Sequence, residues 1–470
     1  MPAAQPAVRW LDDEPAALPP GVTHVPALIV GAGACGLTAA LVLVEAGIEC
    51  LVVERDAQPA GSTALSSGFI PAAGTRAQQA RGIEDAPAAF AQDIQHKAGG
   101  DAAPRLVQAY TEAIGPALDF LQDQGLRWEV LDGFLYPGHS RHRMHCLPER
   151  TGVALVAALG RAVQARGVPV LGEATARELI VDRRRHVRGV RLQRPGGLQE
   201  TVACEALLLA CNGYGGSAEL RQRFLGAMAL APFAGHAGND GTAVRWGEAL
   251  GARLADMAAC QGHGSWAVPH GALISWALMA EGGVQINARG ERFHDESRGY
   301  SEAAPAVLAQ PGGTAWCVFD DPLLALARGF PDFVQAAEAG ALRSAVDVAA
   351  LAAVIGCDEP ALARTLEAVA PGLADPHGRS FVRALRPPYH AVRVTGALFH
   401  TQGGLDVDDQ GRVCAADGTP LPNLWAGGGA ARGVSGPRLE GYLSGNGLLS
   451  AVAGAWISAH AIAGFCRAIA

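Results

Sequence analysis

The sequence predicts an α/β fold in which a dinucleotide-binding domain of Rossmann type is interrupted by an inserted segment. Three observations carry this prediction. Residues 27–56 form a strand–glycine turn–helix–strand unit, the last fifty residues contain glycine-rich strand ends and an apolar helix, and the middle differs in composition. A chain of 470 residues exceeds the roughly 100–200 residues of an ordinary domain, so two or more domains are expected.

Each part of the unit at residues 27–56 has a role. ALIV is a short buried strand, LTAALVLVEAG is a helix with an apolar face, and ECLVVE is a second buried strand. Between strand and helix, GAGACG places Gly31, Gly33 and Gly36 in G-x-G-x-x-G spacing. The first glycine permits a tight turn, the second lets the backbone approach a pyrophosphate, and the third allows close helix–strand packing. The phosphates would face the helix N-terminus.

The second strand ends on Glu54, about 20 residues after the glycines, where a carboxylate accepts hydrogen bonds from a ribose. An acid here, in place of an arginine, argues against a 2′-phosphate, so FAD or NAD is favoured over NADP. The next segment, AGSTALSSGFIPAAGT at residues 60–75, is rich in small residues and has little charge. Such a chain can lie against a planar ring and offer it backbone N–H groups.

Taken together, GAGACG, VVERD and GSTALSSGFIPAAGT resemble the FAD-binding opening of the fumarate reductase/succinate dehydrogenase flavoprotein family. That family includes ketosteroid and tricarballylate dehydrogenases. The resemblance implies FAD as the cofactor. Members with covalently linked FAD carry a histidine in this stretch, whereas Ser62, Thr63 and Ser66 stand here, so non-covalent FAD is expected.

Four later segments fit the same family. EALLLACNGYGG (205–216) is similar to a strand that returns to the FAD, and GNDGTAVRWGEALGA (238–252) resembles a helix start with Asp240 as N-cap. NLWAGGGAARG (423–433) resembles the strand and turn near the isoalloxazine, with Gly429 in place of the usual Glu. The helix that begins in GYLSGNGLL could stabilise the negative edge of the flavin. The cofactor-binding residues implied by these matches are Gly31, Gly33, Gly36, Glu54, Arg55, Ser62, Thr63, Ser67, Gly68, Ala210, Asn212, Gly213, Asp240, Gly428, Ser444, Gly445, Asn446 and Leu448.

The resemblance also implies the domain boundaries. Residues 1–221 and 376–470 would form the Rossmann-like FAD-binding domain, and residues 222–375 an inserted α+β capping domain that closes over the substrate. Periodicity alone indicates only a mixed α/β insertion in the middle of the chain.

Composition excludes several classes of protein. Hydrophobic residues make up 49% and charged residues 17%, as in a globular chain. A net charge of −8 lacks the basic footprint of a nucleic-acid-binding protein. The N-terminal MPAAQPAVRWLDDEPAALPPGV lacks the features of a signal peptide, and no uninterrupted apolar run reaches the ~20 residues of a membrane span. We therefore expect a cytoplasmic protein.

The ten cysteines form neither CxxC nor CxxCH, and most of them lie in apolar runs. We expect buried free thiols, with no metal or iron–sulfur site.

One candidate for substrate binding is YPGHSRHRMHCLPERTG at residues 136–152, a dense basic run in an acidic chain. It is either a solvated basic loop or part of a substrate site. The resembling fumarate reductases bind a substrate carboxylate with a histidine before a similar segment, which implies His145 as a catalytic residue. Arg143, Arg150 and His142 are expected to bind substrate.

HTQGG at residues 400–404 is a second candidate, similar to His-Thr-Met-Gly-Gly in fumarate reductases. The resemblance implies a substrate contact for His400, where the alternative is a surface turn. In GVSGPRLEGYLSGNG (433–447), Arg438 matches the family's arginine clamp, although a surface pair with Glu440 is also possible. Tyr442 is an alternative proton donor, because ketosteroid-type members use tyrosines.

The largest departure from the family lies in the inserted segment. Fumarate reductases carry a proton-donating arginine shortly before a segment similar to INARGERF, and Met279 or a neighbour occupies that place. Methionine cannot transfer a proton, so this chain is not expected to be a true fumarate reductase. Arg292, Glu296 and Arg298 could relay protons instead, although a structural ion pair is the alternative for Arg292.

We therefore expect an FAD-dependent oxidoreductase acting on a C–C or C=C bond next to a carboxylate or carbonyl. Its substrate would be a small carboxylic acid or ketone, and its electron partner external, because the chain lacks heme and iron–sulfur motifs. The alternatives are a ketosteroid-like dehydrogenase of a bulky neutral ketone and a non-catalytic flavin-bound subunit that transfers electrons or acts as a scaffold. If His145 and Arg438 both point away from the flavin, the acid hypothesis fails.

Overall fold

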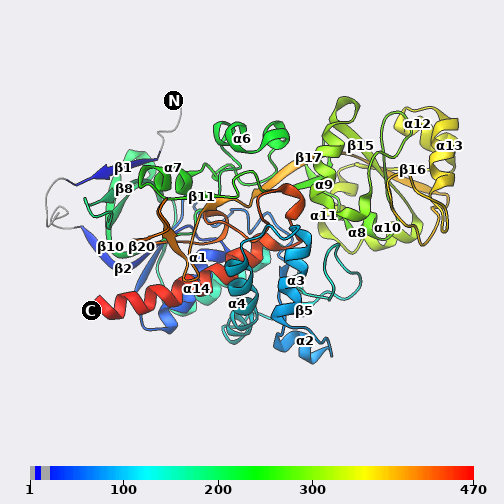
Figure 1. Ribbon diagram of the computed structural model, residues 1–470. Helices are drawn as coiled ribbons and strands as arrows, with labels where there is room; N and C mark the ends of the chain where they lie inside the picture. Colours follow the sequence, from blue (N-terminus) through cyan, green and yellow to red (C-terminus); the bar gives the residue numbers. More distant parts are fainter. Residues whose placement is uncertain (1–5, 12–21, 470) are drawn as a thin grey trace.

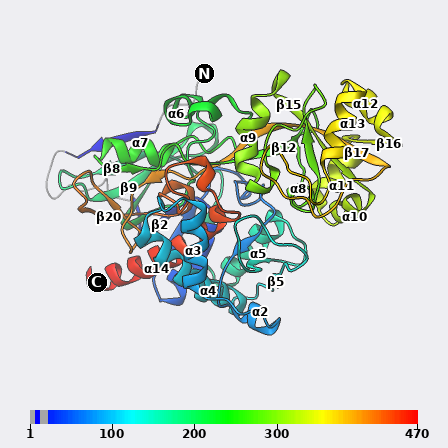
Figure 2. The ribbon, with the colours of Figure 1, turned by 45° about the vertical axis from the view of Figure 1, so that its right-hand side comes forward.

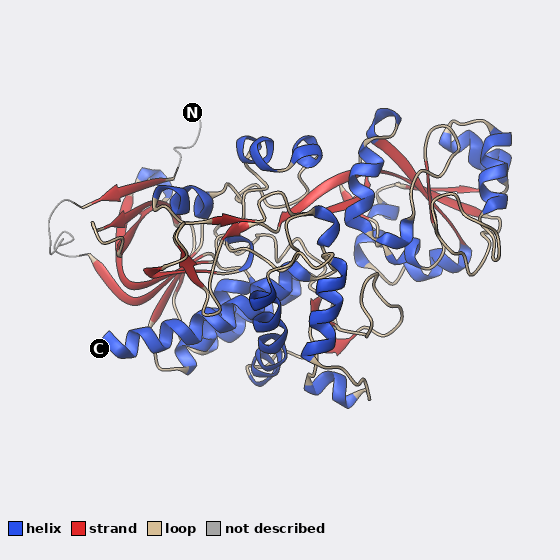
Figure 3. Cartoon of the chain, viewed as in Figure 1, coloured by secondary structure: helices blue, strands red, loops and turns tan. Residues whose placement is uncertain are grey.

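The computed structural model describes residues 6–11 and 22–469, so most of the N-terminal segment on which the absence of a signal peptide was predicted lies outside the described residues. The chain forms two bodies side by side, each with its own sheet and its own hydrophobic core (Figures 1 and 3). We call the body with both chain ends the main domain and the other the cap.

The main domain is built on a mixed sheet in the order β1-β8-β9-β10-β2-β3-β7, with β20 on β10 and β19 on β20. Its strands are β1 (Ala7–Trp10), β2 (Thr23–Val30), β3 (Cys50–Val53), β7 (Val170–Leu171), β8 (Thr175–Val181), β9 (Val187–Gln193), β10 (Gln199–Leu209), β19 (Arg412–Cys414) and β20 (Pro420–Ala426).

Four parallel strands of this sheet end level with one another. Val30 at the end of β2 pairs with Val53 of β3 and with Leu209 of β10, and Leu209 pairs with Ala426 of β20. In open α/β sheets, ligands bind at the carboxyl ends of such strands. The segments predicted to bind a dinucleotide, which are far apart in sequence, therefore leave the sheet at a common edge.

Helices cover the sheet as the apolar patterns predict. α1 (Ala34–Glu45) connects β2 to β3 and packs against α5 (Gly152–Ala165) and α14 (Asn446–Ile469), and α14 also packs on α4 (Pro104–Asp123). By length and composition alone, α14 could span a membrane, although the sequence contains no uninterrupted apolar run of that length. However, 61% of its most apolar window is buried inside the fold, as in a core helix.

Smaller elements complete the main domain. They are β4 (Ile70–Pro71), β5 (Glu129–Val130) and β6 (Met144–Cys146) in one small sheet, the pair β11 (Leu254–Ala255) and β18 (Gly404–Leu405), and the helices α2 (Arg76–Ala80), α3 (Pro87–Lys97), α6 (Ala218–Phe224) and α7 (Thr242–Ala249).

The cap contains an antiparallel sheet in the order β13-β12-β17-β15-β14, with β16 also on β17. Its strands are β12 (Cys260–Ala267), β13 (Ala272–Leu273), β14 (Val284–Ile286), β15 (Thr314–Asp320), β16 (Leu342–Ala345) and β17 (Tyr389–Thr401). Its helices are α8 (Ala277–Ala280), α9 (Tyr300–Leu308), α10 (Asp321–Ala327), α11 (Pro331–Glu338), α12 (Val348–Ile355) and α13 (Glu359–Ala368).

The cap spans a different range from the predicted 222–375. β17 lies beyond residue 375 yet pairs with β12, β15 and β16 of the cap sheet. Conversely, Trp246 of α7 belongs to the core of the main domain. The long strand β17 runs from the cap towards the main domain, as the turned view also shows (Figure 2). Sequence patterns alone did not reveal that strand pairing, because β17 finds its partners far along the chain.

Candidate functional site

A continuous cavity begins at the level strand ends and extends into the space between the main domain and the cap. Thirteen of the residues predicted to bind the cofactor lie on its wall: Gly31, Gly33, Glu54, Arg55, Ser62, Thr63, Ser67, Ala210, Asn212, Gly428, Ser444, Gly445 and Leu448. We call this part of the cavity the dinucleotide half.

The glycine turn after β2 is fixed from both sides. Gly31 has a φ of +111°, and a Cβ there would collide with the carbonyl oxygen of Ala210. The N–H of Ala32 donates to Glu54 Oε2 at 2.8 Å, and the N–H of Ala34 donates to Thr63 Oγ1 at 3.0 Å. α1 therefore begins beside a cradle of backbone, and the first turn of a helix carries N–H groups without intrahelical acceptors. This geometry fits a pyrophosphate.

The segment of small residues is bound to the end of β10. Ser62 Oγ accepts hydrogen bonds from Asn212 Nδ2 at 2.6 Å and from Asn239 Nδ2 at 2.9 Å. The segment thereby forms part of the wall of the dinucleotide half, and Ser444 and Gly445, just before α14, form another part. The residues present thus fit an FAD that runs from Glu54 to the start of α14.

Five predicted cofactor residues lie behind this wall. A Cβ at Gly36 would collide with the carbonyl oxygen of Gly31, and one at Gly213 with Thr401 Oγ1, so both permit close packing. Gly68 has a φ of +72° and lies against the backbone of Thr151. The remaining two, Asp240 and Asn446, act through other residues.

Asp240 differs from the predicted N-cap. The N-cap position of α7 is Gly241, and Asp240 precedes it. Its carboxylate still accepts from the N–H of Thr242 at 3.1 Å, but it also forms an ion pair with Arg55 at 2.9 Å. Asp240 therefore holds Arg55 on the cavity wall.

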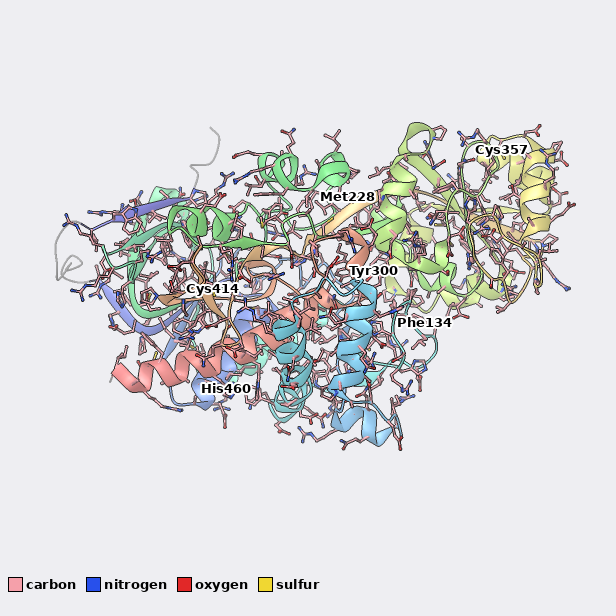
Figure 4. All side chains as sticks on the ribbon, in the orientation of Figure 1. Phe134, Met228, Tyr300, Cys357, Cys414 and His460 are labelled. Carbon is pink, nitrogen blue, oxygen red and sulfur yellow. The ribbon has the colours of Figure 1, made fainter. Side chains whose placement is uncertain are left out.

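Beyond the dinucleotide half, the cavity continues into a space walled mainly by aromatic side chains from both domains, which we call the aromatic chamber. Its walls include Tyr136, Gln261, His263, Leu273, Ser275, Trp276, Tyr300, Phe330, Asp332, Phe399, His400 and Tyr442. Figure 4 shows Tyr300 at the junction of the two domains and Phe134 in a main-domain loop near the cap. The rings of Phe134 and Phe330 lie 5.9 Å apart across that junction.

Tyr300 lies at the centre of the chamber's ring contacts. His263 stacks on it with 4.6 Å between centroids, and the ring of Tyr442 is 5.9 Å away. His263 Nδ1 accepts from the N–H of Ser265 at 3.1 Å, and burial lowers its pKa to about 3. His263 is therefore neutral at physiological pH.

Burial makes both tyrosines weaker acids than usual. Desolvation raises the pKa of Tyr442 to about 12, and the N–H groups of Gly447 and Gly445 together with the Tyr300 hydroxyl act in the opposite direction. Burial and the nearby Tyr442 raise the pKa of Tyr300 well above its ordinary value. The two backbone N–H groups at the start of α14 thus favour the ionised form of Tyr442.

His400 lies on the wall beside the start of α14. A Cβ added at Gly447 would be 3.9 Å from His400 Nδ1 and 3.8 Å from Tyr442 Oη, so these two side chains approach the same point. Burial lowers the pKa of His400 to about 4, which leaves the imidazole neutral. His400 can therefore donate or accept a hydrogen bond but carries no positive charge at neutral pH.

The basic run at residues 136–152 turns its charged side chains away from the cavity. Fully buried Arg143 forms ion pairs with Asp85 at 2.7 Å and with Asp93. His145 is also buried, with Nε2 bonded to Thr75 Oγ1 and Nδ1 to the carbonyl oxygen of Arg143, both at 2.7 Å. The run contributes Tyr136 and Met144 to the cavity wall instead.

The other predicted cations are also engaged elsewhere. Exposed Arg438 pairs with Asp101 at 2.9 Å, and not with Glu440. Arg150 is exposed with Glu129 as its ion-pair partner at 3.6 Å. His142 lies off the wall, and its carbonyl oxygen accepts from Gln78. Among the described residues, no arginine lies on the wall of the aromatic chamber to bind a substrate carboxylate, contrary to the prediction from the sequence.

The charged residues proposed as a relay form a buried structural cluster in the cap. Arg292 binds Glu296 at 2.6 Å and also pairs with Asp375, and Arg379 binds Glu296 at 2.9 Å. Arg298 is exposed, and Met279 lies in the cap core. None of these described residues lies on the cavity wall. Arg292 therefore forms a structural ion pair, the alternative to a proton relay.

Sequence reasoning missed most of the chamber. Tyr300 follows the charged segment RFHDESRG, which drew attention to its charges alone. Gln261 and His263 alternate with Gly262 and Gly264 in β12, and the glycines let α9 approach closely. This alternation of polar residues and glycine in a strand is the signal that could have revealed them.

The described residues contain no group of three or more His, Cys, Asp and Glu side chains arranged to hold a metal ion. All ten cysteines are free, and eight of them are buried.

Comparisons with known proteins agree with this geometry. The family described as FAD binding domain matches residues 27–448. NADH:fumarate oxidoreductase of Klebsiella pneumoniae (strain 342) is 27% identical over 87% of this chain and 44% of its own length. Urocanate reductase of Eggerthella lenta is 28% identical over 86% of this chain and 70% of its own length. The chain thus spans less than half of the first relative and about two thirds of the second.

Two solved structures share the fold. A flavocytochrome c3 fumarate reductase in its open conformation aligns with a TM-score of 0.80 at 24% identity, covering 95% of this chain and 79% of that one. The 3-ketosteroid-Δ4-(5α)-dehydrogenase from Rhodococcus jostii RHA1, in complex with 4-androstene-3,17-dione, aligns with a TM-score of 0.76 at 22% identity. That alignment covers 97% of this chain and 99% of the other.

The predicted family, the predicted fold class and FAD as cofactor are thereby confirmed. The chain belongs to the FAD-binding family of fumarate reductase-like flavoprotein oxidoreductases.

Proposed function

We propose that this protein oxidises or reduces a CH–CH bond next to the carbonyl of a bulky, neutral ketone. The observation that carries the proposal is the aromatic chamber, whose walls are mainly apolar and aromatic with a few polar groups. Such a lining binds an apolar ring system and orients it by a small number of hydrogen bonds.

The charges around the chamber argue against a carboxylic acid. His145 and Arg438, the residues expected to bind a carboxylate, have protein partners outside the cavity. The chamber histidines His263 and His400 are neutral at physiological pH, because burial lowers the pKa of both. Asp332 contributes a carboxyl group to the same space. A carboxylate substrate would meet repulsion there without a compensating cation.

FAD, when bound in the dinucleotide half, supplies hydride transfer at the flavin ring. The residues of this chain then have two tasks. The aromatic walls hold the ketone and exclude water, which fixes the reacting carbon relative to the ring. Tyr442 transfers the proton, since its hydroxyl lies beside His400 and two backbone N–H groups favour its ionised form. Tyr300 stays protonated and acts as a hydrogen-bond donor beside it.

The electron partner is proposed to be external, either a small oxidant or another protein. The described residues hold neither a metal cluster nor a disulfide that could pass electrons onward.

A substrate screen on the purified flavoprotein tests the proposal. The flavin is reduced anaerobically by light with EDTA as the electron donor, and its reoxidation is followed after addition of an enone such as 1,4-androstadiene-3,17-dione or of fumarate. In the oxidised enzyme, 4-androstene-3,17-dione is tested with an artificial electron acceptor. We expect the ketones to perturb the flavin spectrum and to exchange electrons with it, and fumarate to do neither. Turnover of fumarate in preference to ketones would overturn the proposal, and no exchange with any substrate would favour the scaffold alternative.

A further inference from the structure

A chain of buried hydrogen bonds leads from the start of α14 to His400. Asn446 Nδ2 donates to Ser435 Oγ at 3.0 Å, and the Ser435 hydroxyl donates to Gln402 Oε1 at 3.0 Å. Gln402 Nε2 then donates to His400 Nδ1 at 2.8 Å. Asn446, Ser435 and Gln402 are all at most 3% exposed, so water does not compete for these bonds.

The donor-to-acceptor direction of these hydrogen bonds determines which nitrogen of the His400 imidazole carries the proton. The Asn446 amide donates to the Ser435 hydroxyl, and that hydroxyl donates in turn to the Gln402 side-chain carbonyl. The carbonyl end of Gln402 is therefore occupied, and its NH₂ group faces His400. A nitrogen that accepts a hydrogen bond from an amide cannot carry its own proton. In a neutral histidine the proton then resides on the other nitrogen, Nε2.

Nε2 lies against Gly429, and both residues are on the cavity wall. A Cβ at position 429 would collide with Asn212 Oδ1 and lie 2.7 Å from His400 Nε2, so the absence of a side chain at Gly429 lets the imidazole approach the wall this closely. Within the described residues, Nε2 has no hydrogen-bond partner. Two of the positions at which this chain departs from the family pattern, Gln402 for Met and Gly429 for Glu, thus adjoin His400.

We propose that Asn446, Ser435 and Gln402 hold His400 as the neutral Nε2–H tautomer, which makes it a fixed hydrogen-bond donor to a carbonyl oxygen in the cavity. Gln402 is a positioning residue, because it acts through its hydrogen bond to the His400 imidazole and does not itself contact the ligand. The carbonyl belongs either to the flavin ring or to the ketone. In the second case the inference rests on the proposed function.

Nitrogen NMR of the FAD-loaded protein, labelled with ¹⁵N-histidine, tests the tautomer directly. The His400 signals are assigned by their loss in His400→Gln. At neutral pH we expect a pyridine-type Nδ1 and a pyrrole-type Nε2 in the natural protein. Gln402→Glu should reverse the two, because a carboxylate accepts the proton of Nδ1–H, whereas Gln402→Met should leave a mixture of tautomers. Gln410→Met, an exposed glutamine, is the matched control and should change nothing.

A protonated Nδ1 in the natural protein, or an unchanged tautomer in both folded Gln402 variants, would overturn the inference. Flavin content and thermal unfolding establish that each variant is folded. If Gln402→Glu fails to fold, Ser435→Ala provides the same test one link earlier, with the mixture of tautomers expected.

Binding experiments then identify the acceptor. If it is the ketone, Gln402→Met should weaken binding of 4-androstene-3,17-dione about tenfold, ~1.4 kcal/mol, with the flavin spectrum of the ligand-free protein unchanged. If it is the flavin, that spectrum itself shifts. A change in neither would contradict the donor role of His400. Failure of the natural protein to bind any ketone would instead contradict the proposed function and leave the tautomer result standing.

Discussion

The dinucleotide half and the aromatic chamber share one cavity but are built in different ways. The dinucleotide half consists largely of backbone at the level ends of β2, β3, β10 and β20, with small side chains around it. The chamber consists of large side chains contributed by segments of both domains. A backbone site recognises a group common to a whole family, whereas a wall of side chains can change its ligand by substitution. Variants should therefore affect FAD and substrate separately.

The largest effect is expected from Gly31→Ala. The new Cβ would collide with the carbonyl oxygen of Ala210 at a φ of +111°, which L-residues rarely adopt. We expect loss of bound flavin, measured as the ratio of visible to ultraviolet absorbance. Gly160→Ala in α5, where a Cβ meets no atom within 4 Å, is the control and should retain full flavin content. Normal flavin content in Gly31→Ala would show that the turn does not limit binding.

Tyr442→Phe should leave FAD in place and slow turnover of the ketone by about 10²–10⁴-fold, the usual contribution of a positioned acid or base. The pKa of Tyr442, raised to about 12 by burial, predicts that the residue is protonated in the resting enzyme. Turnover by reduction should therefore persist across neutral pH. Steady-state rates with Tyr389→Phe, a cap tyrosine off the cavity wall, serve as the comparison. A reduction in kcat below tenfold would exclude Tyr442 as the proton-transfer group.

A smaller effect is expected from Asp332→Asn in α11. Burial raises the pKa of the Asp332 carboxyl, which has no hydrogen-bond or ion-pair partner within the described part of the chain. Removing its charge should strengthen binding of a ketone that carries a carboxylate by about tenfold and leave a neutral ketone unaffected. Lowering the pH through the pKa of Asp332 should act in the same direction, because the protonated form no longer repels the anion. Equal effects on both ligands, in titrations followed by the flavin spectrum, would argue against charge exclusion.

The smallest effect is expected from Arg438→Ala. Its guanidinium is exposed and pairs with Asp101, which is half-exposed, so the pair should contribute less than about 1 kcal/mol. Ketone turnover and the midpoint of thermal unfolding should both stay close to those of the natural protein. A loss of turnover like that of Tyr442→Phe would restore the arginine clamp and, with it, the acid hypothesis.

The sequence by itself determined the cofactor, the family and the type of fold. The glycine spacing, the acid after the second strand and the segment of small residues describe local backbone geometry, which neighbouring residues impose on one another. The notable error concerned the basic run, where the pattern showed the charges but not their direction. Arg143 faces Asp85 and Asp93, fifty or more residues away, and only the fold brings those carboxylates to it.

The tertiary structure alone decided the character of the substrate site. Tyr300 of the cap and Tyr442 of the main domain are 142 residues apart in sequence, yet their rings lie 5.9 Å from each other. Which aromatic residues face the cavity depends on how the cap sheet docks through β17, and no local pattern encodes that docking. Turns and strand ends are fixed by residues close in sequence, whereas a chamber between two domains exists only when both have folded and met.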